Sequence, residues 1–144
     1  MSFTLHTRTP DIDTYRHLRR EAGLSPKTTE AAAIGLPNSL FAVQVFDGEI
    51  VVGMGRVIGD GGLFFQVVDI AVLPAYQGQG LGKQIMAAIS DWLRANVPES
   101  GYVSLLADGD AQHLYARYGF VPTAPASVGM RYLADAQRGN AASA

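Results

Sequence analysis

The chain has 144 residues, a formal net charge of -2 and no cysteine; this length fits one domain with its own hydrophobic core, and the lack of cysteine excludes disulfides, thiolate metal sites and cysteine nucleophiles. The mildly acidic balance, in which the longest basic run is the pair Arg19 and Arg20, argues against nucleic-acid binding and favours a small-molecule or protein partner. No apolar stretch approaches the roughly 20 residues of a membrane helix, and the first residues lack a secretory pattern, so we expect no membrane contact and a cytoplasmic location.

The N-terminal part of the chain predicts one strand and two helices. Residues 3–8 alternate as in a strand, and residues 11–24 carry apolar side chains at helical spacing behind Asp11, a suitable helix cap. Residues 27–36 predict a second, short helix that ends before Pro37. The apolar face of the first helix consists of Ile12, Tyr15, Leu18 and Ala22.

The middle of the chain predicts an antiparallel meander of strands. Two apolar segments, residues 39–46 and 49–58, flank an Asp-Gly pair, which is a strong hairpin signal. A glycine-rich turn at residues 59–62 joins the second segment to a third strand over residues 63–72.

The C-terminal part predicts two helices that alternate with strands. An amphipathic helix is expected over residues 80–96, followed by a buried strand over residues 102–107. A further helix over residues 109–119 should end at Gly119, and a last strand is expected over residues 127–133.

The resulting order of elements, βααβββαβαβ, indicates a mixed α+β fold. We expect a single domain over residues 1–135. Residues 136–144 are small and polar, which is typical of a flexible tail.

Three glycines in five positions lie directly at the start of the predicted helix over residues 80–96, within Gln77–Lys83. Backbone amides at a helix start have no partner within the helix and attract anions, and glycine lets phosphates approach them closely. Lys83 adds a positive charge. The alternative is that the glycines only form a tight strand-to-helix turn. The spacing matches neither the Walker loop, which needs a glycine at position 77, nor the dinucleotide fingerprint, which needs one at position 83.

The segment Gln77-Gly78-Gln79-Gly80-Leu81-Gly82 matches Arg/Gln-x-x-Gly-x-Gly/Ala, the acetyl-coenzyme A signature of the GNAT superfamily of N-acetyltransferases. Residues 111–120, "AQHLYARYGF", resemble the Leu-Tyr-x-x-x-Gly-Phe helix end of the same family. The two motifs occur in the family's order within the family's succession of elements. The resemblance implies a GNAT fold, with a central, mostly antiparallel twisted sheet that is flanked by helices and splayed where coenzyme A binds.

The resemblance also implies acetyl-CoA as co-substrate and a set of residues that bind it. In the family, the amides of the turn hold the pyrophosphate, and the main chain of the preceding strand binds the pantetheine arm and the thioester carbonyl. An amide aimed at that carbonyl would stabilise the oxyanion formed during acyl transfer. No metal is expected, because no histidine and carboxylate pair has metal spacing. The implied coenzyme-binding residues are Ile70, Ala71, Val72, Gln77, Gly78, Gln79, Gly80, Leu81, Gly82, Lys83, Asp108, Ala111 and Tyr115.

Two side chains are candidates for proton transfer. Tyr115 matches the family tyrosine that points at the coenzyme sulfur and serves as general acid; the alternative is a packed ring whose hydroxyl bonds to backbone. Asp69 interrupts an apolar strand, where an unpaired carboxylate is costly to bury. Many relatives carry an acid at the matching position, which makes Asp69 the candidate general base. Its alternatives are a structural carboxylate paired with a neighbour such as Arg56, or a residue that binds the substrate ammonium.

Three further expectations concern Asp108, the large aromatic side chains and the oligomeric state. Asp108 stands where the family often has an asparagine that contacts the pantetheine chain, so Asp108 either accepts hydrogen bonds there or caps the following helix. Phe64, Phe65 and Trp92 are expected in the core rather than in a substrate site. Dimers are common in the family, so a homodimer is among the expected states.

The acceptor is usually held by the first helices and by the later strand loops, which correspond to residues 23–37 and 121–130. Both segments are mostly small and apolar and lack clustered acids, which favours a small amine over a polycationic one. With no cysteine for an acyl-enzyme, we predict direct transfer of the acetyl group to a primary amine of a small molecule in a ternary complex. The alternatives are a non-catalytic acetyl-CoA sensor and acetylation of a protein or peptide amine.

Overall fold

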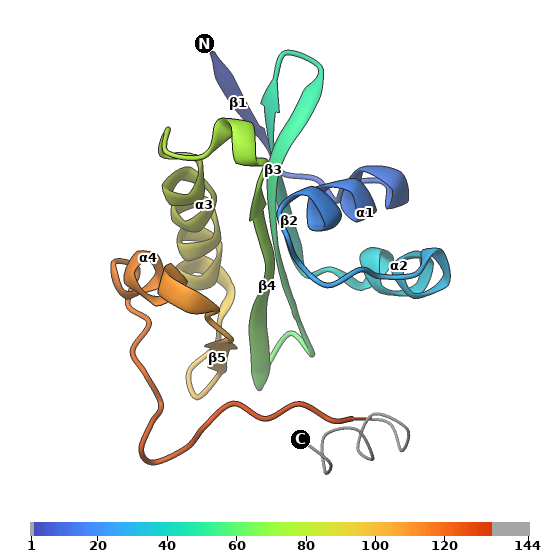
Figure 1. Cartoon of the computed structure of the whole chain (residues 1–144). Coiled ribbons are helices and arrows are strands. Elements are labelled where there is room, and N and C mark those ends of the chain that lie inside the picture. The colour runs from blue at the N-terminus through green and yellow to red at the C-terminus, as the bar shows by residue number, and fades with distance from the viewer. Residues whose placement is uncertain (1, 134–144) are drawn as a thin grey trace, which may run out of the picture.

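The computed structural model describes residues 2–133, and its centre is one five-stranded sheet with the strand order β1-β2-β3-β4-β5 (Figure 1). The first three pairings are antiparallel, whereas β4 and β5 are parallel. This architecture confirms the predicted α+β fold with a mostly antiparallel sheet. The strands are β1 Phe3–His6, β2 Phe41–Asp47, β3 Ile50–Gly59, β4 Phe64–Val72 and β5 Tyr102–Leu105.

Helices cover both faces of the sheet, with α1 and α2 on one face and α3 and α4 on the other (Figure 1). Asp11 caps α1 as predicted, because its carboxylate accepts a hydrogen bond from the amide of Thr14 at 2.8 Å. The helices are α1 Ile12–Glu21, α2 Thr29–Gly35, α3 Leu81–Asn96 and α4 Gln112–Ala116, and the short 3-10 turns are η1 Leu36–Asn38, η2 Pro74–Tyr76 and η3 Gly109–Ala111.

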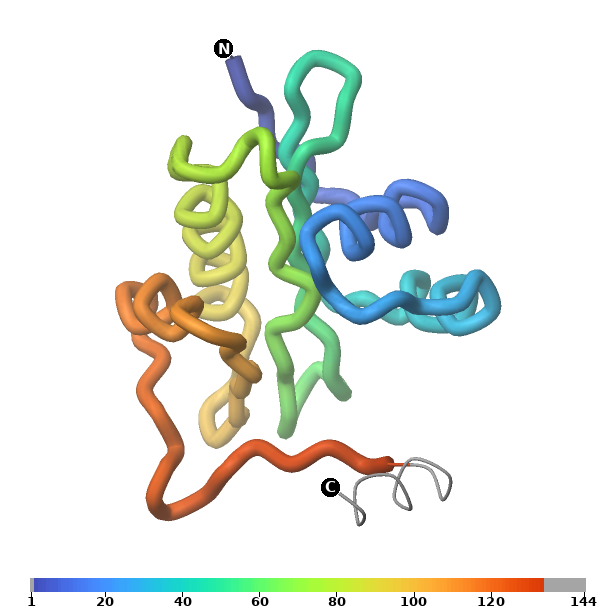
Figure 2. The backbone as a smooth tube through the Cα atoms, viewed as in Figure 1, coloured from blue at the N-terminus to red at the C-terminus, as the bar shows by residue number. Residues whose placement is uncertain are grey.

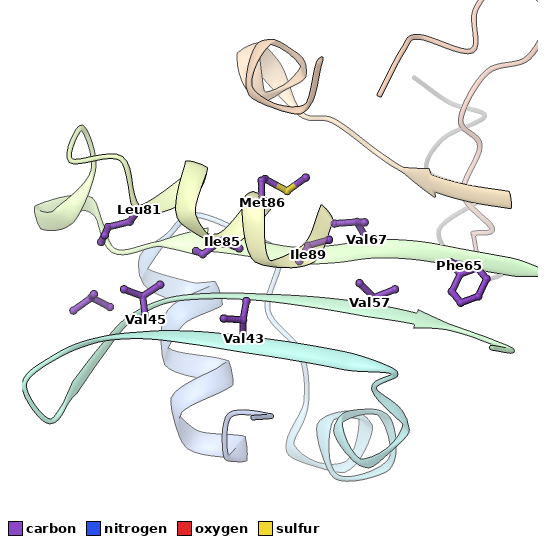
Figure 3. Close-up of a cluster of buried hydrophobic side chains, with 10 residues drawn as sticks. Val43, Val45, Val57, Phe65, Val67, Leu81, Ile85, Met86 and Ile89 are labelled. Atoms are coloured by element: carbon purple, nitrogen blue, oxygen red, sulfur yellow. The ribbon is translucent and has the colours of Figure 1, made fainter. Parts of the chain in front are cut away.

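The sheet separates two hydrophobic cores. The larger core lies between the sheet and α3 (Figure 3), and the smaller core lies between the sheet and the first two helices. Since β3 and β4 contribute side chains to both cores, the position of each strand residue is set by packing on two sides. The larger core consists of Val43, Val45, Val52, Val57, Phe65, Val67, Leu81, Ile85, Met86 and Ile89, and the smaller core of Tyr15, Leu18, Ala32, Leu36, Met54 and Ala71.

A bulge in β4 turns Asp69 away from the larger core. Val67 packs in that core, so strict alternation along the strand would place Asp69 on the same face. Instead, Asp69 has a φ of 60°, and the pairing of β4 with β3 shifts register between Met54 and Arg56. Asp69 therefore contacts α1, while Ile70 packs against the larger core.

The last two strands are paired over only part of β4. Phe64–Val67 pairs with Tyr102–Leu105, and β4 then continues to Val72 beyond the end of β5. This divergence is the splay that the resemblance predicts.

The structure corrects three expectations for the C-terminal part of the chain. The predicted strand over residues 127–133 is absent, because the segment runs extended past the end of the sheet with its apolar side chains in solvent (Figure 2). The strand predicted as buried over residues 102–107 ends at Leu105 and is only partly buried, since β5 lies at an edge of the sheet. The helix expected over residues 109–119 is shorter, because residues 109–111 form the 3-10 turn η3, in which Gly109 has a φ of 53°, and α4 extends only from Gln112 to Ala116.

Two further predictions concern the large aromatic side chains and the C-terminal tail. Phe65 and Trp92 pack in the core as expected, but Phe64 is 64% exposed, because it lies at the end of the sheet against the exposed Tyr102. The predicted tail over residues 136–144 lies outside the described residues.

Candidate active site

The glycine turn before α3 presents a row of unpartnered backbone amides. Gly78 and Gly80 both have a φ of 81°, a left-handed conformation that glycine adopts without strain. The first amide that donates within α3 belongs to Gln84, which bonds to the carbonyl of Gly80 at 3.1 Å. Within residues 2–133, the amides of Gly78–Lys83 have no acceptor, so the turn offers a row of free donors of the kind that suits an anion.

α4 packs directly on this turn. A Cβ atom at Gly82 would lie 3.3 Å from Cδ2 of Leu114, so only a small residue leaves room for this approach. From the end of α4, the hydroxyl of Tyr118 donates a hydrogen bond to the carbonyl of Lys83 at 2.8 Å. Leu114 thus touches the turn, and the next residue, Tyr115, lines a cavity.

That cavity has a volume of about 570 Å³ and lies where β4 and β5 diverge. Asp69 and Ile70 line it from β4, and Asp108, Ala111 and Tyr115 line it from the segment after β5. The fold therefore brings both candidate catalytic side chains into one cavity. The predicted turn residues 77–83 do not line it and lie at its α4 side, and Ala71 is buried against the smaller core.

Asp69 is held by three donors. Its Oδ1 accepts hydrogen bonds from the hydroxyl of Tyr15 at 3.0 Å and from Nη1 of Arg19 at 2.5 Å. Its Oδ2 accepts a hydrogen bond from Nε of Arg56 at 2.8 Å. The ion pair with Arg56 agrees with one of the alternatives for Asp69. Since the Asp69 side chain is only 4% exposed, these contacts compensate for the loss of hydration.

Tyr115 differs from Asp69 because its hydroxyl makes no hydrogen bond within the described part of the chain. Burial raises the pKa of the Tyr115 phenol, and the negative charge of Asp108 raises this pKa further. The phenol is therefore protonated at neutral pH and has a free O–H group at the cavity. Asp108 lies at the N-terminal cap position of η3, but its side chain makes no capping hydrogen bond.

The two segments expected to hold the acceptor separate in the structure. Gly23, Leu24, Ser25 and Lys27 line the 570 Å³ cavity. Residues 121–124 and 127–131 instead line a second cavity of about 770 Å³, which shares Asp108 and Tyr115 with the first. Gln77, a predicted coenzyme-binding residue, also ties the glycine turn to β4, because its side-chain Nε2 donates a hydrogen bond to the carbonyl of Val72 at 3.1 Å.

Tyr15 and Arg19 belong to the site although the sequence pattern did not predict them there. Both lie on the face of α1 that also carries Leu18 and Ala22, and Tyr15 was expected only to pack. A signal was present, because Arg19 occupies a position on this inward face, where an arginine needs a buried partner.

A family model described as an acetyltransferase (GNAT) domain matches residues 37–122. The chain belongs to the GNAT acetyltransferase family. The matched range includes β4, the glycine turn and α4, which are the elements that build the site described above.

Similar solved structures agree with this membership. A probable acetyltransferase of unknown function from meticillin-resistant Staphylococcus aureus is 50% identical, with a TM-score of 0.88 over 92% of this chain and 100% of that chain. A GNAT family acetyltransferase from Streptococcus pneumoniae TIGR4 is 26% identical, with a TM-score of 0.75 over 93% of this chain and 99% of that chain. These structures confirm the predicted GNAT fold.

Two curated relatives are N-acetyltransferases as well. The uncharacterized N-acetyltransferase ycf52 of Gracilaria tenuistipitata var. liui is 26% identical over 84% of this chain and 66% of its own length. The ycf52-like N-acetyltransferase of Prochlorococcus marinus is 30% identical over 78% of this chain and 64% of its own length. The chain thus spans about two thirds of the length of these relatives.

GNAT acetyltransferases generally use acetyl-CoA, and the residues present fit this co-substrate. The unpartnered amides of Gly78–Lys83 suit a pyrophosphate. Beyond Val67, the main chain of β4 no longer pairs with β5. This part of the strand lies next to the cavity that Tyr115 lines, where its main chain can bind the coenzyme.

Residues 2–133 contain neither a metal-binding cluster nor a helix that could span a membrane. No group of three or more histidine, aspartate or glutamate side chains is arranged to hold a metal ion there. Nor does this part of the chain contain a helix with the length and apolar character needed to cross a bilayer.

Proposed function

We propose that the chain is an acetyl-CoA-dependent N-acetyltransferase that moves the acetyl group directly to a primary amine of a small molecule within a ternary complex. The observation that carries this proposal is the run of unpartnered amides at Gly78–Lys83, which α4 connects to the cavity that contains Asp69 and Tyr115. An anion site beside a cavity with ionisable side chains is what acyl transfer from a phosphorylated carrier requires.

The backbone provides most of the binding in this proposal. Acetyl-CoA, when bound, supplies the activated acetyl group. The amides of Gly78–Lys83 and the Lys83 ammonium hold its pyrophosphate, and the main chain at Ile70 and Val72 holds the pantetheine arm. In this proposal, a backbone amide of this strand stabilises negative charge on the acetyl oxygen during attack.

Tyr115 is the proposed proton donor to the departing thiolate. Its hydroxyl is free of other hydrogen bonds within the described residues, and its raised pKa keeps the proton in place at neutral pH. Both properties favour a general acid over a ring that only packs.

The role of Asp69 as general base stays a prediction, and its surroundings favour the structural alternative. Tyr15, Arg19 and Arg56 already donate to its two oxygens, so a proton taken from the amine would weaken these contacts. Asp69 then acts as a positioning residue that holds the two guanidinium groups beside the cavity. Their positive charge favours the neutral form of a nearby amine, which is the nucleophilic form.

Initial rates of thiol release from acetyl-CoA with a panel of primary amines test this function. Intersecting double-reciprocal lines are expected for a ternary complex, whereas parallel lines would contradict direct transfer. Acetyl-CoA binding without turnover on any amine would instead support the sensor alternative. Turnover restricted to peptide amines would support acetylation of proteins.

A further inference from the structure

A buried cluster of two guanidinium groups and one carboxylate lies in the wall of the cavity. Nη1 of Arg19 is 2.5 Å from Oδ1 of Asp69, and Nε of Arg56 is 2.8 Å from Oδ2. The side chains of Arg19, Arg56 and Asp69 are 10%, 9% and 4% exposed. Tyr15, the remaining donor to Asp69, is a neutral phenol. The cluster therefore has one positive charge that no carboxylate neutralises, in a place largely shielded from water.

The hydrogen-bonding capacity of this cluster is not fully used. Arg19 uses all three of its nitrogens, because Nε and Nη2 donate to the carbonyl and the hydroxyl of Ser25 at 2.9 and 3.0 Å. Arg56 uses Nε for Asp69 and Nη1 for the hydroxyl of Ser39 at 2.7 Å. Nη2 of Arg56 has no hydrogen-bond partner among residues 2–133.

The unpartnered nitrogen of Arg56 is accessible, and Arg56 lines two cavities. Within the described residues, no fully buried side-chain nitrogen or oxygen lacks a hydrogen-bond partner, so Nη2 is accessible to solvent. Arg56 as a whole is 7% exposed and lines two cavities, the one of about 570 Å³ and a smaller one of about 160 Å³. Arg56 thus has an unused, solvent-accessible donor and a side chain that lines space a ligand can occupy.

The cationic side chains around these two cavities gather on one side of the site. The smaller cavity is lined by two cations, Lys27 and Arg56, and by no acidic residue. Lys27, Arg56, Arg19 and Asp69 also line the larger cavity, together with Asp108 beside Tyr115. The positive charge is therefore concentrated on the side of α1 and α2, away from the proposed proton donor.

We propose that Arg56 and Lys27 form a binding site for an anionic group, a carboxylate or a phosphate, that the acceptor amine carries in addition to its amino group. A guanidinium that keeps an unused donor beside a cavity can bind an anion there, and charge-assisted hydrogen bonds to carboxylate and phosphate are among the strongest that arginine makes. The inference rests on the proposed function, because it names the class of acceptor for the same cavity. The acceptor is then an amine with an acidic substituent rather than a simple alkylamine.

Matched amines test the inference by two independent measurements. The first set contains the common amino acids and the amines that remain after removal of their carboxylate, and the second contains O-phosphoethanolamine and ethanolamine. Acetylation of each is followed by thiol release from acetyl-CoA, and binding of each is followed by the thermal midpoint of the protein without acetyl-CoA. We expect at least a roughly tenfold lower KM for the anionic member of the preferred pair. Comparing the two sets distinguishes a carboxylate from a phosphate.

Two variants connect this selectivity to the named residues. Lys27→Gln should raise KM for the anionic acceptor roughly threefold without changing kcat, since an exposed charge contributes modestly. Arg56→Lys should raise the same KM roughly tenfold, because a single ammonium nitrogen cannot reproduce the planar fork that reaches Asp69 and Ser39 and leaves a third nitrogen for the anion. Arg20→Gln is the matched control, because it removes an exposed positive charge of α1 that lines neither cavity. It should leave the selectivity unchanged.

The outcomes distinguish a failure of the anion site at Arg56 and Lys27 from a failure of the proposed acetyl transfer. Neutral amines that are acetylated as well as their anionic partners would overturn the anion site and leave the transferase intact. Anionic amines that raise the thermal midpoint while no amine is acetylated would support the anion site and contradict the transferase. If no amine binds or reacts, both proposals are wrong.

Discussion

Arg56 and Asp69 lie on neighbouring strands, and Nε of Arg56 donates to Oδ2 of Asp69 at 2.8 Å across the bulge in β4. The bulge matters because it moves the carboxylate from the core under α3 to the face where α1 supplies Arg19. One irregular residue in a strand thereby assembles a charged cluster from three elements that are distant in the sequence.

Replacing Asp69 by Asn should destabilise the fold strongly. The change leaves two buried guanidinium groups without their shared negative charge, a loss of about 3 to 5 kcal/mol in the free energy of unfolding. Urea unfolding measures this loss. Asp91→Asn is the control, because the pair of Asp91 with Arg94 is mostly exposed and should change the stability by no more than about 1 kcal/mol. Similar losses in the two variants would contradict the importance of the buried cluster.

Replacing Tyr115 by Phe should lower kcat roughly 100-fold while the affinity for acetyl-CoA is retained, because the variant lacks the proton donor but keeps the ring. Steady-state kinetics and calorimetric binding measure the two effects. The wild-type rate should decline only as the pH rises through the raised pKa of Tyr115, above its usual value of 10.0. This alkaline decline should be missing in the variant.

The matched control for this substitution is Tyr118→Phe, which removes the hydroxyl that bonds to Lys83 on the same helical segment. We expect it to affect coenzyme affinity more than kcat. An unchanged kcat in Tyr115→Phe would show that the proton comes from elsewhere.

Replacing Tyr15 by Phe should make the protein less sensitive to alkaline pH. Burial raises the pKa of Tyr15, and the negative charge of Asp69 raises it further. Because the folded-state pKa lies above the unfolded value of about 10, the stabilising contribution is complete below pH 10 and is lost as the pH rises through the folded-state pKa. The free energy of unfolding, measured between about pH 9 and pH 11, should fall less steeply in Tyr15→Phe. If the free energy of unfolding falls equally steeply with pH in both proteins, the raised pKa of Tyr15 is contradicted.

Replacing Gly80 by Ala should weaken acetyl-CoA binding beyond its effect on stability. A left-handed backbone costs a residue with a Cβ atom about 1 kcal/mol, and relief of that strain would move the amides of the turn. Gly61→Ala is a suitable control, since Gly61 has a φ of 84° in the turn before β4 and lines none of the described cavities. Both variants should lose similar stability, but only Gly80→Ala should lose affinity for acetyl-CoA in calorimetric titrations.

Local patterns predicted much of the fold and the glycine turn. The periodicity of α3, the Asp-Gly hairpin and the cap at Asp11 are short-range signals, so they could be interpreted without knowledge of tertiary contacts. The spacing of the glycines and the motif around Tyr115 likewise depend on adjacent residues.

Features set by contacts between distant segments were not predictable in the same way. The bulge at Asp69 depends on packing against both cores, and no local pattern distinguishes it from a regular strand. Arg19 has its role only because α1 packs beside β4. For residues 127–133, the local pattern alone predicted a strand wrongly. The alternating apolar side chains of this segment, such as Val128 and Met130, are exposed and do not pack against the sheet.

The thermal midpoint with and without acetyl-CoA tests the central claim most directly. A ligand at 100 times its dissociation constant stabilises the folded protein by about 2.7 kcal/mol, which corresponds to a rise of roughly 5 to 10 °C for a domain of this size. We predict such a rise for the wild type and a much smaller one for Gly80→Ala. No rise for the wild type at millimolar acetyl-CoA would contradict coenzyme binding at the glycine turn and, with it, the proposed acetyl transfer.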